Sequence, residues 1–270
     1  MAGGIQLMLL TGFQLACDGN PVSLPMSAQR LVAFLGLQER PVQRNYVGGA
    51  LWLDSPDDRA AASLRSALWR ARQPGLCLIE AETGGLRLSR EVTVDIKEAT
   101  RFAHRVGDPT VPWNDADPQL ETLSGDLLPD WYEDWVLVER ERFHQIRLHA
   151  LETICLRLTQ QARFAEAIEA GMASVRAEPL RESANRCLIK AHLAEGNRIE
   201  ARRHYERFRQ LLNKELNESP SPDLEVLIHG DENQHFERAE NIVVDALLGN
   251  GRASPQRVPF DHAVNAPAET

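Results

Sequence analysis

The sequence predicts a mainly α protein, with a small α+β unit at the N-terminus followed by an all-α domain. Alternating apolar residues, typical of strands, occur only in about the first ninety positions. Apolar residues spaced by three and four dominate from Val94 onward, and a 34-residue period links two later segments. The length of 270 residues suits two domains, and 43% hydrophobic with 26% charged residues is ordinary for a globular protein.

The N-terminal unit should open with a short antiparallel meander. Every second position is apolar in two short runs, which are Ile5, Leu7, Leu9 and then Phe13, Leu15, Cys17. The turn-forming sequence Asp18-Gly19-Asn20 follows. These runs predict strands joined by tight turns.

Three helices are expected next. The first follows Pro25, with Ser27 as its cap, and the second covers about Arg44 to Trp52. Gly48-Gly49 weakens the second, because each glycine costs about 1 kcal/mol relative to alanine in a helix interior. The third has the strongest start signal, Ser55-Pro56-Asp57-Asp58, which offers a cap, a proline at the first helical position and two acids. It should run to about Arg72.

The third helix is predicted to have one apolar face and one basic face. On a helical wheel the apolar side chains fall together, namely Ala60, Leu64, Ala67, Leu68 and Ala71. The opposite face carries Arg59, Ser66, Trp69 and Arg70, with Arg65 and Arg72 on one flank. No acidic residue lies between Ala60 and Arg72. We expect Trp69 to pack against the following hairpin or the second domain rather than to contact a base.

A hairpin closes the N-terminal unit, with Leu76, Leu78 and Leu86, Leu88 on either side of the glycine-rich tip Glu82-Thr83-Gly84-Gly85. The order of meander, three helices and hairpin predicts a winged helix-turn-helix in residues 1–93. A basic helix face alone is more often a solvated surface. Its position between a helix-turn unit and a basic hairpin favours double-stranded DNA, with the helix in the major groove and the hairpin along the backbone.

The charge distribution is compatible with that partner. The net charge of the chain is −9, which argues against phosphate binding when taken alone. Residues 1–92, however, hold nine Arg, no Lys and eight acidic residues, so the acidic excess lies in the second half.

Residues 94–229 are predicted to form an all-α, tetratricopeptide-like domain. A helix should cover Asp95 to Val106, followed by a polar loop over residues 107–118. Trp131 and Trp135, with Val138, should begin a long helix and occupy its core face, which Ile146, Ala150, Ile154 and Leu158 continue. Glu166-Ala167 recurs as Glu200-Ala201 after 34 residues, the tetratricopeptide period, and such helix pairs present protein-binding surfaces.

A short helix should end near Leu227, and residues 230–270 form a polar tail that we expect to be largely disordered. Within the tail, residues 233–248 could form one more helix, and the final twenty residues are expected to be disordered. No role is assigned to this segment.

Several phrases of the sequence resemble the Streptomyces antibiotic regulatory protein family in family order over about residues 5–229. They are Ser27–Leu35, Leu51-Trp52, Ser63–Arg70 with Arg72, Gly125–Pro129 and Arg140-Glu141-Arg142. The resemblance implies an OmpR-type winged helix joined to a bacterial transcriptional activator domain. It implies an activator that binds direct repeats near a promoter −35 element, self-associates on tandem sites and holds RNA polymerase through its sigma subunit.

The resemblance also places the DNA contacts. Arg65, Arg70 and Arg72 lie in the matching recognition-helix motif, with Ser66 and the hairpin residue Arg87 next, and Arg59 and Arg44 complete the predicted set. The chain departs from the family pattern at Gln43, where a small capping residue is usual, at the Gly48-Gly49 pair, and at Asn217, where glycine is favoured. Asparagine also tolerates the left-handed conformation, so this last change is mild.

Other classes of function are disfavoured. The sequence has no GxxxxGK[ST], HExxH or GxSxG motif, so we expect neither an enzyme nor a cofactor or metal site. Cys17, Cys77, Cys155 and Cys187 are scattered and should be reduced core thiols of a cytoplasmic protein, since neither a secretory signal nor a membrane span is visible. The main alternative is a protein interaction adaptor whose winged helix does not read DNA.

Overall fold

The computed structural model describes residues 4–108, 110–111 and 120–229. The chain divides into two compact units, Met1–Glu218 and Ser219–Thr270. The predicted polar tail, residues 230–270, and most of the predicted loop before residue 119 lie outside the described residues. In the second unit, residues 222–229 are helical, as expected from the sequence.

A four-stranded sheet opens the first unit, and it confirms the predicted meander. Strand β1 (Ile5–Met8) pairs antiparallel with β2 (Gln14–Cys17), which pairs with β3 (Asn20–Pro21). The fourth strand, β6 (Val92–Val94), was not predicted, and it pairs parallel with β1 in the order β3-β2-β1-β6. The sheet therefore brings the end of the winged helix back to its beginning.

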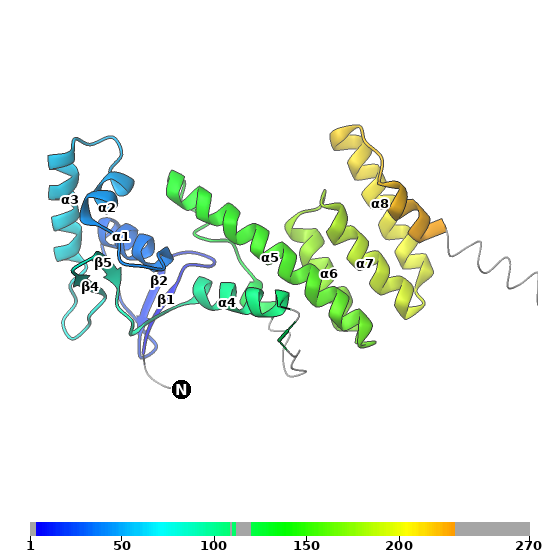
Figure 1. Cartoon of the computed structure of the whole chain (residues 1–270), viewed down its shortest axis with the longest axis horizontal. Helices are drawn as coiled ribbons and strands as arrows, with labels where there is room; N and C mark the ends of the chain where they lie inside the picture. The colour runs from blue at the N-terminus through cyan, green and yellow to red at the C-terminus, as the bar shows by residue number, and fades with distance from the viewer. Residues whose placement is uncertain (1–3, 109, 112–119, 230–270) are drawn as a thin grey trace, which may run out of the picture. The chain divides into compact units, whose positions relative to one another are not determined.

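The three predicted helices and the hairpin are confirmed (Figure 1). They are α1 (Met26–Leu37), α2 (Arg44–Leu51), α3 (Asp57–Arg70) and the hairpin β4 (Ile79–Glu82) and β5 (Gly85–Leu88), which we call the wing. The predicted caps were wrong. Ser27 lies inside α1, and Pro25, Gln43 and Pro56 occupy the three cap positions without a side-chain cap hydrogen bond. Proline at N-cap of α1 and α3 presets the extended backbone from which the helix starts.

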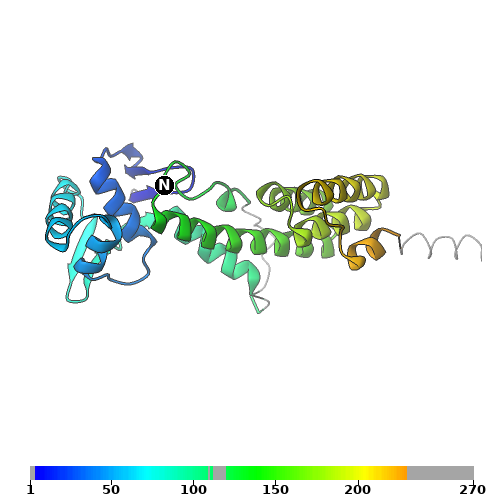
Figure 2. The same cartoon turned by 90° about the horizontal axis from the view of Figure 1, so that it is seen from above.

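Among the described residues after β6, the regular elements are all helices, as predicted. Helix α4 (Asp95–Gly107) lies beside the long helix α5 (Asp134–Gln160), which Figure 2 shows from above. A short 3-10 helix, η1 (Leu120–Leu123), precedes α5. Helices α6 (Phe164–Ala177), α7 (Glu182–Glu195) and α8 (Arg198–Leu216) then pack in succession, each on the one before.

The 34-residue repeat corresponds to α6 and α8, the second members of two helix pairs. Ala167 and Ala201, one repeat apart, are both completely buried. Gly196 ends α7 and Asn217 ends α8 in the left-handed conformation, with φ values of +90° and +55°. Asparagine at position 217 therefore serves the role expected of the family's glycine.

The tryptophan prediction was right about packing and wrong about the helix. Trp131 precedes α5, which begins at Asp134, and Val138 is 66% exposed, while Val136 is buried in its place. Trp131 and Trp135 meet edge to face with centroids 6.2 Å apart and pack against the core of the winged helix. Trp135 also meets Phe34 of α1 edge to face. Pro129 and Leu128, which has a left-handed backbone (φ +43°), precede the helix. Because neither residue fits a helix interior, the helix begins only after them.

The winged helix and the first part of the helical region share one hydrophobic core. The core includes Leu127, Leu128, Val136 and Phe143 together with the buried residues of β1 and α1. A second core is formed by α4, α5, α6 and α7. The two parts are therefore packed together rather than joined by a free linker.

Backbone hydrogen bonds reinforce this shared core. The Leu128 amide donates to the Leu9 carbonyl at 2.9 Å, and the Thr11 amide donates to the Asp126 carbonyl at 3.0 Å. At the start of α4, the Asp95 carboxylate accepts hydrogen bonds from the amides of Leu9 and Leu10, each at 2.9 Å. Burial raises the pKa of Asp95, and these bonds to the ionised form oppose that effect.

The cysteine prediction was half right. All four thiols are free, and Cys155 and Cys187 are buried, but Cys17 is only partly buried and Cys77 is exposed. Burial raises the pKa of Cys155 to about 12 and that of Cys187 to about 11, so both stay protonated at neutral pH. Within the ranges that the structure describes, no helix is both long and apolar enough to cross a membrane.

Candidate nucleic-acid interface

Helix α3 has the two faces that its sequence predicts. Its apolar side is buried, through Ala60, Leu64, Ala67 and Ala71, with Leu68 half-buried. The side chains predicted to contact DNA are exposed, namely Arg59, Arg65, Ser66, Arg70 and, just beyond the helix, Arg72. The helix is therefore held by one face and open on the other.

Three of the predicted arginines surround one hollow. Arg65 and Arg72 from α3 and Arg44 from the start of α2 line a cavity of about 710 Å³ between α3 and the wing, whose Ala81 also lines it. Arg44, Arg59, Arg65 and Arg72 make no side-chain hydrogen bond or ion pair with any described residue. Their charges are thus not neutralised by the described part of the protein.

Arg70 and Ser66 differ in their surroundings. The Arg70 Nη1 donates to the Ser27 hydroxyl of α1 at 3.2 Å, an exposed bond that ties the end of α3 to α1. Ser66 is exposed next to Arg65. Arg59 lies in the first turn of α3, close in sequence to Asp57 and Asp58, and does not line the hollow. The seven predicted residues therefore do not form one equivalent set.

Arg87 on the wing is paired within the protein. Its Nη1 lies 3.3 Å from Oε1 of Glu82, and its Nε lies 3.6 Å from Oε2 of Glu80. A hydrogen bond from Ser89 lowers the pKa of Glu80, and the Arg87 charge contributes to the same effect. Arg87 is only partly exposed, so its charge is less available to a phosphate than those around the hollow.

The wing is fixed to the segment before α2. The amide of Val42 donates to the Leu86 carbonyl, and the amide of Leu86 donates back to the Val42 carbonyl, both at 2.8 Å. Gly85 has φ +131°, and a Cβ there would lie 2.1 Å from the Val42 carbonyl oxygen. Only glycine permits this approach. The second glycine of the tip is therefore required by the packing of the wing against Val42.

The expected packing of Trp69 was wrong. This side chain is 71% exposed on α3 and lines the same hollow as Arg65 and Arg72. The helical wheel placed Trp69 on the outer face of the helix. We nevertheless expected it to pack, because tryptophan is usually buried. The open face of α3 thus carries a large aromatic group as well as arginines.

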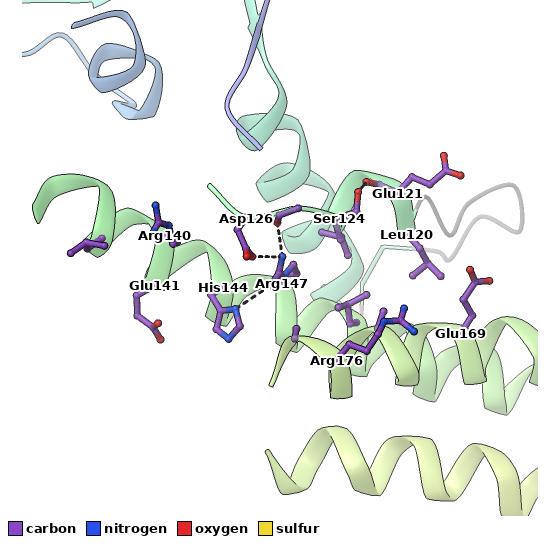
Figure 3. Close-up of a pocket in the computed structure, with 16 residues that line it drawn as sticks. Leu120, Glu121, Ser124, Asp126, Arg140, Glu141, His144, Arg147, Glu169 and Arg176 are labelled. Carbon is purple, nitrogen blue, oxygen red and sulfur yellow. Dashed lines mark hydrogen bonds and ion pairs between the residues drawn. The ribbon is translucent and has the colours of Figure 1, made fainter. Parts of the chain in front are cut away.

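A second hollow, of about 780 Å³, lies between the segment that ends at Asp126 and helices α5 and α6 (Figure 3). Its central charge is Arg147, which is 8% exposed and faces Asp126 at 3.0 Å. Arg147 also donates to the Gly125 carbonyl and contacts the His144 Nδ1 at 3.2 Å. These contacts hold Gly125 and Asp126 against α5, so the charged groups in this hollow have a structural role.

The fold and the open basic helix define a transcription regulator of the winged-helix class with an attached helical domain. The family model of the bacterial transcriptional activator domain matches residues 90–230, more than half of the chain, and the chain belongs to that family. With the winged helix in front, it has the architecture of the Streptomyces antibiotic regulatory proteins, which confirms the resemblance seen in the sequence.

Among solved structures, the chain is similar to Mycobacterium tuberculosis EmbR in complex with a low affinity phosphopeptide, with a TM-score of 0.65 and 22% identity. The similarity covers 86% of this chain and 66% of the EmbR chain, so this protein spans slightly less than two thirds of that length. At this identity the likeness concerns the fold. No curated protein matches the sequence.

Proposed function

We propose that this protein is a sequence-specific DNA-binding transcription activator, in which α3 enters the major groove and the wing follows the backbone. One observation carries the proposal. Arg44, Arg65 and Arg72 line one hollow beside an exposed helix face, without an ion-pair partner among the described residues. Arginine suits bidentate contacts with guanine edges and phosphates, so such a group fits duplex DNA.

The local charge outweighs the net charge of −9 for this purpose, because a bound phosphate responds mainly to charges within about a Debye length. Binding to a polyanion would release counterions, and the affinity would fall steeply with salt. The salt dependence therefore separates a DNA reader from a protein that merely has a winged-helix fold.

The test is to select duplexes from a random pool with the full chain and to measure affinity between about 50 and 200 mM salt. Arg65→Ala and Arg72→Ala should each weaken binding and reduce the salt slope by about one if the arginine contacts a phosphate. Loss of a base contact should cost about 1 to 3 kcal/mol. Arg101→Ala, an exposed arginine of α4, is the matched control and should change neither quantity.

By family resemblance, we also propose that two copies bind side by side on direct repeats near a −35 element and hold RNA polymerase through its sigma subunit. Footprinting on a selected site should then show two adjacent protected repeats. Transcription with purified polymerase should rise with the wild-type chain and should not rise with Arg65→Ala. The functional division at about residue 94, between the reader and the helical domain, is part of this proposal.

The alternative is a protein interaction adaptor that does not bind DNA. A groove of about 380 Å³ between α6, α7 and α8 favours some role in protein contacts, because it is lined by Met172, Val175, Leu188, Phe208 and Leu211. Absence of salt-dependent binding to any duplex would refute the activator and leave the adaptor. Such a groove is also compatible with an activator that contacts other proteins.

A further inference from the structure

Trp69 shares its hollow with two of the predicted arginines at the C-terminal end of α3. Arg65 precedes it by four residues, a spacing that places both side chains on the same side of the helix, and Arg72 follows just beyond the helix end. All three line the hollow beside the wing. The indole is thus placed between two cationic side chains on the surface that the proposed function presents to DNA.

The described residues give this indole no ring partner and no hydrogen bond. Trp131 and Trp135, in contrast, meet each other edge to face. Trp131 also stacks on Phe13, and Trp135 meets Phe34 edge to face. A tryptophan that is 71% exposed keeps a large apolar surface in water. Covering that surface with the apolar atoms of a binding partner removes it from water and lowers the free energy of the complex.

The surrounding charges identify duplex DNA as the partner rather than another protein. Arg44, Arg65 and Arg72 are complementary to a polyanion, and they flank the indole in the same hollow. An indole cannot neutralise a phosphate. The apolar group that base pairs present in the major groove is the 5-methyl of thymine.

We propose that Trp69 is a specificity-determining residue that contacts the 5-methyl group of a thymine in the major groove, with Arg65 and Arg72 contacting the neighbouring nucleotides. This inference rests on the proposed function, and it adds a base preference to it. The arginines supply charge, and the tryptophan supplies discrimination for a T·A pair.

The experiment replaces single thymines of the selected site by deoxyuridine, which lacks only the 5-methyl group. One replacement should weaken wild-type binding about fourfold, the equivalent of one buried methylene. The same replacement should leave the affinity of Trp69→Ala unchanged. Trp69→Ala should itself bind the thymine site about tenfold more weakly than wild type, because it loses the whole aromatic contact.

Salt dependence distinguishes this role from that of the arginines. Trp69→Ala removes no charge, so its salt slope should equal that of the wild type, whereas the slope of Arg65→Ala should fall. Leu53→Ala is the control, since Leu53 is 69% exposed in the same domain but does not line the hollow. Circular dichroism should show that both variants keep the wild-type helix content.

Two results would overturn the thymine contact while leaving the proposed function intact. In one, wild type and Trp69→Ala lose the same affinity at every deoxyuridine. In the other, Trp69→Ala impairs only the binding of a second copy to a tandem site, which would assign the indole to a protein contact. If the wild-type chain selects no sequence and shows no salt-dependent binding, both the thymine contact and the proposed function are refuted.

Discussion

The Nε of Arg30 in α1 lies 2.8 Å from Oε1 of Glu133, the residue that precedes α5. The pair joins the winged helix to the helical region at the edge of their shared core. Both side chains are about a quarter exposed, at 24% and 30%, so water screens part of their attraction. The Arg30 Nη2 also donates to the Leu51 carbonyl at 2.7 Å, which holds the arginine in place independently of Glu133.

Removing this ion pair should therefore have a small effect. We expect Glu133→Gln to lower the free energy of unfolding by no more than about 1 kcal/mol. Urea unfolding followed by circular dichroism measures the change, and Glu139→Gln, at the more exposed pair with Arg142, is the control. A loss several times larger would show that the pair is the main link between the two parts.

Arg140 should matter far more than the Arg30–Glu133 pair, because it satisfies three backbone carbonyls. Its guanidinium donates to the carbonyls of Leu127, Leu128 and Trp131. Leu127 and Leu128 are completely buried, so their carbonyls would have no ready access to water. We expect Arg140→Met to cost about 2 to 4 kcal/mol of unfolding free energy.

Arg142→Met is the matched control for this measurement, since Arg142 lies two residues away and 58% of its side chain is exposed. It should unfold at nearly the wild-type urea concentration. Equal destabilisation by the two substitutions would contradict the assigned role of Arg140.

Two glycines should respond in opposite directions to alanine. Gly125 has φ +85°, and a Cβ there would lie 2.7 Å from Cγ2 of Thr11, so Gly125→Ala should destabilise the protein by about 1 to 3 kcal/mol. Gly49 lies inside α2 with no atom within 4 Å of an added Cβ, and Gly49→Ala should stabilise by up to about 1 kcal/mol. Thermal unfolding of both variants checks the sign of each change.

The wing offers a substitution that should improve DNA binding. Glu82 lies 3.3 Å from Arg87 and holds part of its charge within the protein. Glu82→Gln should raise affinity for a selected duplex by about twofold to fivefold, because it removes a negative charge from the surface that we propose to face the phosphates. Fluorescence anisotropy at low salt measures the affinity. Weaker binding by Glu82→Gln would show that this part of the wing does not lie along the phosphates. Arg87→Ala should weaken binding less than Arg65→Ala.

Stability should fall in mild acid because of His204. Burial, and then the charges of His192 and Arg207, lower the pKa of His204 to about 4. The unfolded side chain titrates near its usual value of about 6.5, so between these values the unfolded chain binds a proton that the folded chain does not. Stability is therefore complete above about pH 6.5 and decreases as the pH falls towards 4.

The orientation of the Asn185 amide supports this assignment. Its Nδ2 donates to the carbonyls of Pro179 and Arg181, so its Oδ1 accepts from the His204 Nε2 at 2.9 Å. His204→Gln should show a shallower fall of melting temperature between pH 6.5 and 4 than the wild type. Parallel curves for the two proteins would show that other groups cause the acid sensitivity.

The sequence predicted the elements whose patterns are local and long enough to read. The two faces of α3 followed from its helical wheel, and the repeat located α6 and α8. The caps failed because a serine near a helix start indicates only that a cap hydrogen bond is possible. In α1 the Ser27 hydroxyl accepts from Arg70 instead.

Contacts between distant residues left no readable signal. Asp95 binds the amides of Leu9 and Leu10 across more than eighty residues, and β6 is three residues long. The candidate residues were predicted one by one from α3, the second helix and the hairpin. The hollow that gathers Arg44 with Arg65 and Arg72, however, depends on how α2 and the wing pack. The packing predicted for Trp69 was wrong because tryptophan is usually buried, whereas its position on the helical wheel indicated exposure.

The strand β6 ends at Val94 and α4 begins at Asp95, so no spacer separates the winged helix from the helical region. A regulator whose two domains are joined by a flexible linker can act from operators at many distances from the promoter. In a regulator without a flexible linker, the position of the operator around the DNA helix axis determines which way the helical domain faces. On the proposed function, shifting the operator by half a turn of the double helix should silence the promoter, and a shift by a full turn should restore part of its activity.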